Sequence, residues 1–140
     1  MKIKEIMTRD VEGIGPDSNA GDTAQIMTDR KIGFLVVGHK DRLIGVLTDR
    51  DIVTRCVAAG KDPETTPCRE IMTPGVYSCS EDSDVEEVAD DMRKYEVHRM
   101  VIVDKNHRVC GVASLGDIAR AKGEETLAGE VLKDISKKAA

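Results

Sequence analysis

The residues that could do chemistry in this 140-residue chain form one motif that occurs twice. In the first copy, a glycine and two apolar residues precede the hydroxyl of Thr48, and two further residues separate Thr48 from the carboxylate of Asp51. The second copy has Ser114 and Asp117 at the same spacing. An ionised carboxylate can accept both hydroxyls of a ribose, and the start of a helix offers unpaired N–H groups to a polar ligand. The motif therefore predicts a binding site.

The same spacing is also that of an ordinary helix start. Thr48 could cap a helix whose third residue is Asp51, and Ser114 could do the same with Asp117. Such a cap is worth ~1 kcal/mol and needs no ligand. The two interpretations are compatible, because a capping hydroxyl can also face a ligand.

Both motifs belong to a repeat that covers nearly the whole chain. The segment Ile6–Thr8 returns as Ile71–Thr73, 65 residues later, and Gly45 returns as Gly111, 66 residues later. Each copy follows the order strand, helix, strand, strand, helix. We therefore predict an α/β (α+β) fold of two β-α-β-β-α repeats related by a pseudo-twofold axis.

The hydrophobic pattern gives the expected boundaries. The predicted domains are repeat one at 1–60, a stiff linker at 61–67, repeat two at 68–122 and an amphipathic C-terminal helix at 123–140. The strands of repeat one are expected at 11–16, 32–37 and 43–47, with a polar turn at 38–41 and a helix at 18–31. Those of repeat two are expected at 100–103 and 108–113.

Two helices carry more detailed expectations. In repeat two, Ser83 and Glu86 could form a capping box, and the next helix should bury one face, made of Val85, Val88, Ala89 and Met92. The C-terminal helix could pack on its own module or form an oligomer contact, and the sequence favours neither.

Composition excludes several classes of function. A net charge of −5 and an aromatic content of 2% argue against a nucleic-acid partner. No apolar run approaches the ~18 residues of a membrane span, so we expect a cytoplasmic protein with reduced cysteines. The four cysteines and three histidines show no metal-ligand spacing, and no catalytic motif is present. We therefore expect no enzyme activity, no metal and no required cofactor.

The repeat order and the doubled motif resemble a tandem pair of cystathionine-β-synthase (CBS) domains, a stand-alone Bateman module. The openings at 5–8 and 70–73 and the segment His98–Asp104 are also similar to that family. The resemblance implies a regulatory sensor that binds AMP, ADP, ATP, S-adenosylmethionine or NAD in clefts between the repeats. It also implies a homodimer and signalling to a target protein through a change of conformation or oligomeric state. The alternative is a ligand-free scaffolding pair that acts through protein contacts.

The resemblance also assigns roles to residues. Asp51 and Asp117 would hold ribose hydroxyls, and Thr48 and Ser114 would bind the ribose or the first phosphate. The adenine pockets would be lined by Val46 and Val112 together with the backbone around Ile14 and around Tyr77, Ser78 and Cys79.

The basic residues suggest a ranking of the two copies. His98 and Arg99 resemble phosphate contacts that reach the nucleotide of the other repeat, whereas repeat one has Gly33 and Phe34 at the equivalent place. Arg50 adds a positive charge beside the first motif. We therefore expect the Asp51 site to be the better nucleotide site. The alternative role for His98 and Arg99 is to satisfy the end of a helix.

Overall fold

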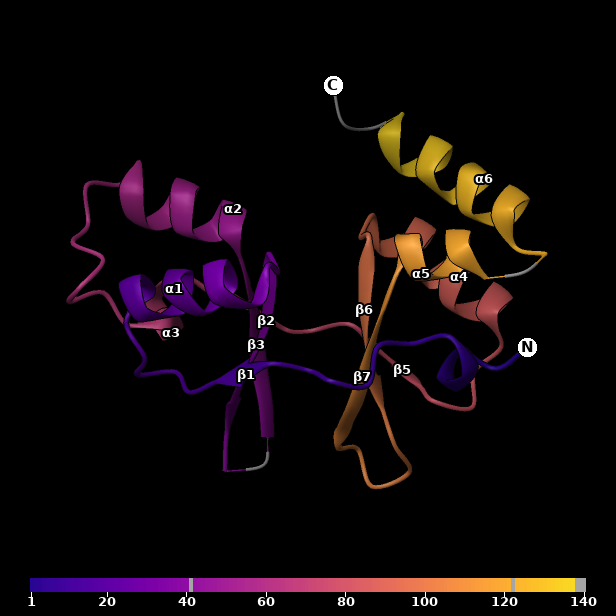
Figure 1. Ribbon diagram of the computed structural model, residues 1–140, viewed down its shortest axis with the longest axis horizontal. Coiled ribbons are helices and arrows are strands. Elements are labelled where there is room, and N and C mark those ends of the chain that lie inside the picture. The colour runs from indigo at the N-terminus through magenta and orange to yellow at the C-terminus, as the bar shows by residue number, and fades with distance from the viewer. Residues whose placement is uncertain (41, 122, 138–140) are drawn as a thin grey trace. The chain divides into compact units, whose positions relative to one another are not determined.

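The computed structural model describes residues 1–40, 42–121 and 123–137, and its chain folds into two compact units (Figure 1). The central unit is Glu12–Val76, and the terminal unit joins Met1–Val11 to the chain from Tyr77 onward. Each unit is a mixed α+β structure, as the sequence predicts. Asp41 in the expected turn, residue 122 at the end of repeat two and residues 138–140 of the C-terminal segment lie outside the described residues.

The central unit is built on a four-stranded sheet with strand order β1-β2-β3-β4. β1 runs parallel to β2, β2 and β3 form an antiparallel hairpin, and β4 pairs antiparallel with β3. The strands are β1 (Gly13–Ile14), β2 (Phe34–His39), β3 (Arg42–Thr48) and β4 (Thr73–Pro74). The helices are α1 (Ala20–Arg30), α2 (Asp49–Asp51), its π-helical continuation η2 (Ile52–Val57) and α3 (Cys68–Ile71).

The terminal unit repeats this plan with a three-stranded sheet of order β5-β6-β7. β5 is parallel to β6, and β6 and β7 form the hairpin. The strands are β5 (Ser78–Ser80), β6 (Arg99–Val103) and β7 (Val109–Ser114). The helices are the 3-10 turn η1 (Ile3–Glu5), α4 (Val85–Tyr95), α5 (Leu115–Arg120) and α6 (Glu125–Ser136).

Alternation along the strands places each core on one face of its sheet. In the central unit, Leu35, Val37 and Leu47 are fully buried and pack in one cluster with Met27 of α1. In the terminal unit, the equivalent cluster is formed by residues of β6, α4, α5 and α6. The predicted apolar face of α4 is confirmed, because Val85, Val88, Ala89 and Met92 are all fully buried.

The opening segment of each sequence repeat packs on the unit built by the other repeat. Thr73 pairs with Val46 of β3, and Thr8 forms the equivalent bridge to Val112 of β7. A second pair of bridges joins Asn19 to Pro67 in the central unit and Lys2 to Asp84 in the terminal unit. The repeats along the chain and the compact units in space are therefore offset by one segment.

Two glycines make this packing possible. A Cβ atom on Gly45 would lie 2.7 Å from the sulfur of Met72, and one on Gly111 would lie 2.5 Å from the sulfur of Met7. These distances are far below van der Waals contact, so the glycine of each motif is required for the close approach of an opening segment.

The predicted capping box at the start of α4 is wrong. The N-cap residue is Asp84, and its side chain makes no capping hydrogen bond. The N–H of Val85 donates instead to the carbonyl of Met1 at 3.0 Å, and the N–H of Ile3 donates to Ser83 at 2.8 Å. Backbone from the N-terminal segment has taken the place that a side-chain cap would fill.

The C-terminal helix packs on its own unit, which was one of its two expected roles. Ala128, Val131 and Ile135 of α6 are buried in the cluster of the terminal unit. Arg93 of α4 also forms ion pairs with two acids of α6, at 3.4 Å to Glu130 and 3.1 Å to Asp134. Leu132 of the same helix remains 46% exposed.

Candidate functional site

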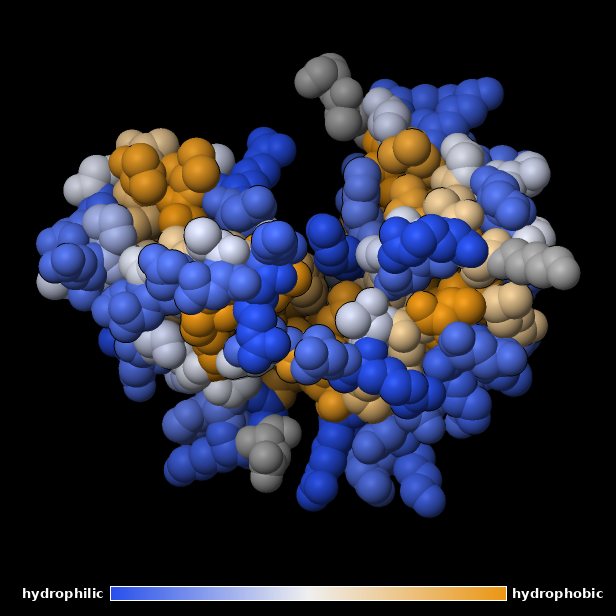
Figure 2. Space-filling view, viewed as in Figure 1, coloured by the Kyte–Doolittle hydropathy of each residue, from blue (hydrophilic) through white to orange (hydrophobic). Residues whose placement is uncertain are grey.

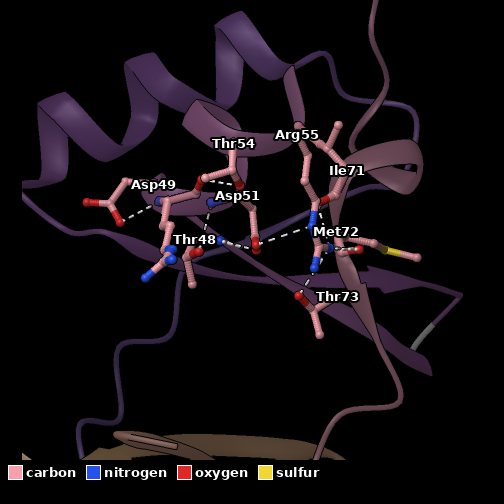
Figure 3. A network of polar contacts seen from close by, with 9 residues as sticks. Thr48, Asp49, Asp51, Thr54, Arg55, Ile71, Met72 and Thr73 are labelled. Atoms are coloured by element: carbon pink, nitrogen blue, oxygen red, sulfur yellow. Dashed lines mark hydrogen bonds and ion pairs between the residues drawn. The ribbon is translucent and has the colours of Figure 1, made fainter. Parts of the chain in front are cut away.

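Both copies of the motif form a reciprocal capping box where a strand ends and a helix begins. In the central unit, Thr48 Oγ1 accepts the N–H of Asp51 at 3.1 Å, and Asp51 Oδ2 accepts the N–H of Thr48 at 3.0 Å (Figure 3). In the terminal unit, the corresponding Ser114 and Asp117 distances are 3.0 and 2.9 Å. The structural role that the spacing predicts is therefore present in both copies.

The second carboxylate oxygen of Asp51 is only loosely paired. It forms a loose ion pair with Arg55, whose Nε lies 3.8 Å from Oδ1, beyond hydrogen-bond distance. Arg55 Nη1 donates instead to the carbonyls of Met72 at 2.9 Å and Ile71 at 3.3 Å, and contacts Thr73 Oγ1 at 3.4 Å (Figure 3). The Asp51 side chain is only 13% exposed. A ligand hydroxyl that donates to this ionised oxygen would therefore form a strong hydrogen bond.

The second oxygen of Asp117 has a close partner. Arg120 Nη2 donates to Oδ1 at 2.6 Å, and the Asp117 side chain is 9% exposed. The arginine reaches back over the first turn of α5, where Gly116 leaves space for it. The two copies thus share their backbone geometry but differ in what faces the free oxygen.

Sequence reasoning did not identify Arg55 and Arg120 as site residues. Each lies three or four residues after its aspartate on a helix, which is the spacing at which side chains of opposite charge meet. That spacing was a usable signal. Whether the arginine binds its aspartate or turns away from it could not be predicted from the sequence. In the central unit this depends on carbonyls of a segment that is distant in the chain.

Of the two expected adenine-lining residues of the central unit, Val46 is next to the motif and Ile14 lies two strands away. Val46 precedes Thr48 by two positions on β3 and is half-buried on the sheet face opposite Leu47. Ile14 is half-buried on β1 and pairs with Val37. They stay predicted lining residues.

In the terminal unit, Val112 has the place of Val46, and Tyr77 and Ser78 are exposed beside β6. The side chain of Cys79 points into the core, so only its backbone is free to line a pocket. Its thiol donates to Asp91 Oδ2 at 3.2 Å.

His98 and Arg99 lie in the terminal unit and are both exposed. At the end of α4, the backbone N–H of Glu96 donates to the carbonyl of Arg93 and that of Val97 donates to the carbonyl of Met92. The helix-end role and the expected role of both residues as phosphate contacts for the nucleotide at Asp51 both stay predictions.

Repeat one departs from the histidine at this point, although the surrounding backbone contacts of the two units correspond. The carbonyl of His98 accepts the N–H of Leu115 at 2.8 Å, and the carbonyl of Gly33 accepts that of Asp49 at 3.1 Å. A Cβ atom on Gly33 would lie 2.8 Å from the carboxylate of Asp49. A side chain at position 33 would therefore have to displace the carboxylate of Asp49 at the start of α2.

Two cysteines of the terminal unit are held as neutral thiols. Burial, together with the hydrogen bond to Asp91, raises the pKa of Cys79 to about 12. Burial and the contact with Glu81 raise the pKa of Cys110 to about 11. All four cysteines are free. Within the described residues, no three His, Cys, Asp or Glu side chains gather as a metal site, and no helix is long and apolar enough to cross a membrane.

Comparison with known proteins identifies the fold. The model of the CBS domain family matches the chain twice, at residues 3–58 and 68–124. The chain belongs to the CBS domain family. It carries a tandem pair of CBS domains, and the paired capping boxes are the repeated feature of that pair.

Relatives in sequence and structure agree with this assignment. The CBS domain-containing protein YhcV of Bacillus subtilis is 33% identical over 96% of this chain and 94% of its own length. The CBS domain protein TA0289 of Thermoplasma acidophilum has a TM-score of 0.86 at 25% identity, over 99% of this chain and 78% of its own. The CBS domain pair of protein MJ0100, solved with 5'-methylthioadenosine and S-adenosylmethionine, has a TM-score of 0.77 at 28% identity, over 86% and 98%.

Proposed function

We propose that this CBS pair is a regulatory module that binds an adenosyl ligand through its capping-box aspartates and carries out no reaction of its own. The candidate ligands are AMP, ADP, ATP, S-adenosylmethionine and NAD. The observation that carries the proposal is Oδ1 of the buried Asp51, which has only a loose ion pair with Arg55 at 3.8 Å and is therefore available to accept a hydrogen bond. The adenosyl compounds bound by MJ0100 support the ligand class.

The chemistry of the motif suits a ribose. Asp51 Oδ2 already accepts one N–H, so the carboxylate keeps acceptor capacity for the two adjacent hydroxyls of a ribose. Hydrogen bonds to an ionised group are worth about 1.5–3 kcal/mol each when well formed. Arg50, exposed in the first turn of α2, adds positive charge for a phosphate. Val46 and the backbone around Ile14 would contact the adenine.

The test is titration of AMP and ATP by calorimetry into the wild type and three variants. We expect Asp51→Ala to weaken AMP binding by about tenfold or more, since a charged hydrogen bond is lost. The matched control is Asp49→Ala, which removes the adjacent exposed acid of the same turn. Asp117→Ala should have the smaller effect.

A larger loss from Asp117→Ala than from Asp51→Ala would contradict the ranking of the two sites. Absence of binding by AMP, ATP, NAD and S-adenosylmethionine at millimolar concentration would contradict the sensor function. That result would favour the scaffolding pair, because the hydroxyl and the carboxylate of each motif each accept a backbone N–H in the capping box and so have a structural role without a ligand.

A homodimer is part of the proposal. Val53 and Val57, one turn apart on η2, are 58% and 60% exposed, and hydrophobic residues gather on this helix at the upper left of Figure 2. Two large apolar side chains in line on a helix are typical of a surface that another chain covers. Light scattering should show a dimer at micromolar concentration and a monomer for Val57→Glu, with Thr54→Glu on the same helix as the control. A wild-type monomer would contradict this assembly.

A further inference from the structure

The two capping-box aspartates differ in the position of their nearest arginine. Arg120 lies three residues after Asp117 and donates to its Oδ1 at 2.6 Å. Arg55 lies four residues after Asp51 and stays 3.8 Å from the equivalent oxygen. A ribose hydroxyl must compete with the first arginine, whereas it meets an available acceptor at Asp51.

Specific contacts hold Arg55 away from Asp51. Its Nη1 donates to the carbonyls of Ile71 and Met72, where α3 ends and the chain enters β4 (Figure 3). These carbonyls lie at a helix end that has no further intrahelical partner for them, so a cation there is favourable. The opening segment of the second repeat thereby keeps the guanidinium beyond hydrogen-bond distance of the carboxylate.

The terminal unit has no arginine at the position that corresponds to Arg55. The position equivalent to Arg55, 66 residues later, is Ala121, which cannot bind the corresponding carbonyls. Gly116 replaces Arg50, and a Cβ atom on it would lie 3.2 Å from Arg120 Nη1. The glycine therefore provides the space in which Arg120 folds back onto Asp117. In the central unit Thr54 has the place of Arg120, and its hydroxyl donates to the carbonyl of Arg50 at 2.9 Å.

We propose that Arg120 is a specificity-determining residue that lowers the affinity of the Asp117 motif for a ribose and so directs the ligand to Asp51. This inference rests on the proposed adenosyl-binding function. The contact between Arg120 and Asp117 acts as an intramolecular competitor for the diol. Arg120 is 73% exposed, so the competition is modest, and a change of about two- to fivefold in affinity is expected.

Adenosine is the probe that isolates this effect. It carries the ribose diol but no phosphate, so loss of a positive charge near a phosphate cannot alter its binding. Residue-resolved ¹⁵N NMR of the full chain reports the two motifs separately through the amides of Thr48–Asp51 and Ser114–Asp117. Arg120→Ala should tighten adenosine binding at the Ser114–Asp117 amides by about two- to fivefold and leave the Thr48–Asp51 amides unchanged.

The matched control is Arg108→Ala, which removes an exposed arginine of the same unit just before β7, at the other end of that strand from Ser114. It should leave both dissociation constants at their wild-type values. If Arg120→Ala leaves the Ser114–Asp117 affinity unchanged or weakens it, the inference is overturned. If adenosine shifts neither set of amides in any variant, the proposed function itself fails, and the two failures are thus distinguishable.

A reciprocal graft gives a second test. The double substitution Arg50→Gly with Thr54→Arg recreates the Gly116 and Arg120 arrangement beside Asp51. Compared with Arg50→Gly combined with Thr54→Gln, which has a long uncharged side chain, it should weaken adenosine binding at the Thr48–Asp51 amides by a similar factor. Equal affinities in the two double variants would contradict the competitor role of an arginine at this position.

Discussion

The central and terminal units share a backbone plan and differ in the side chains that surround their common motif. The backbone bridges correspond pair by pair, with Val46 to Thr73 matched by Val112 to Thr8. Each motif glycine lies against a methionine sulfur of an opening segment. The arginine partners of the two aspartates, by contrast, follow different geometries. The shared backbone therefore determines the fold, and the diverged side chains are where a difference in ligand binding can arise.

A second difference lies where the first strand of each unit meets the end of its helix. In the central unit, Glu12 and Arg30 form an ion pair at 3.2 Å. In the terminal unit, the residues 65 positions later are Tyr77 and Tyr95, whose rings stack with centroids 3.8 Å apart. Lys94 also lies 5.2 Å from the centroid of the Tyr95 ring. The same contact between strand and helix end is therefore an ion pair in the central unit and an aromatic stack in the terminal unit.

The largest expected effect tests the feature that the units share. Gly45→Ala and Gly111→Ala should each lower the free energy of unfolding by about 1–3 kcal/mol, because the added methyl overlaps a methionine and a backbone carbonyl. Urea denaturation followed by circular dichroism measures this. Gly129→Ala, in the interior of α6 with no atom within 4 Å of the new Cβ, is the control and should stabilise by about 0.5–1 kcal/mol. A tolerated alanine at only one motif glycine would show that the two contacts are not equivalent.

A smaller effect is the pH dependence that one thiol of the terminal unit contributes to stability. Cys79, with a pKa of about 12, holds its proton in the folded state above the ordinary cysteine value of 9.0. The unfolded chain therefore loses that proton first, and the free energy of unfolding should fall by roughly 1 kcal/mol per pH unit above about pH 9.

Stability curves between pH 8 and 11 measure the slope for the wild type and for Cys79→Ser. Serine retains a donor for Asp91 and does not titrate in this range. Its slope should be shallower, and an equal slope would show that the thiol proton does not contribute.

The smallest effect concerns the ion pair and the stacked tyrosines. A double-mutant cycle with alanine should give a coupling free energy of about 0.5–1.5 kcal/mol for Tyr77 and Tyr95, and below about 1 kcal/mol for Glu12 and Arg30. Repeating both cycles in 1 M NaCl should abolish the second coupling and retain the first, since a Debye length of about 3 Å screens exposed charges. Equal salt sensitivity would refute the distinction.

Much of the fold follows from local patterns that are present in the sequence. The apolar spacing of Val85 to Met92 identifies a buried helix face because side chains three and four residues apart share one side of a helix. The capping boxes follow from the hydroxyl and acid three residues apart. At α4 the capping-box prediction failed. The N–H of Val85 donates to a carbonyl of the N-terminal segment, a contact that no local sequence pattern predicts.

The sequence by itself determined the repeat, the paired motifs and the α+β class, since each depends on residues close together in the chain. Only the tertiary structure decided which segment packs on which unit and which aspartate keeps an available oxygen. Asp51 and Asp117 are alike in sequence, yet the carbonyls of Ile71 and Met72 draw Arg55 aside, while Gly116 lets Arg120 close on Asp117. The first of these contacts joins residues far apart in the chain, and the second depends on free space around Gly116. The spacing of residues along the sequence predicts neither of them.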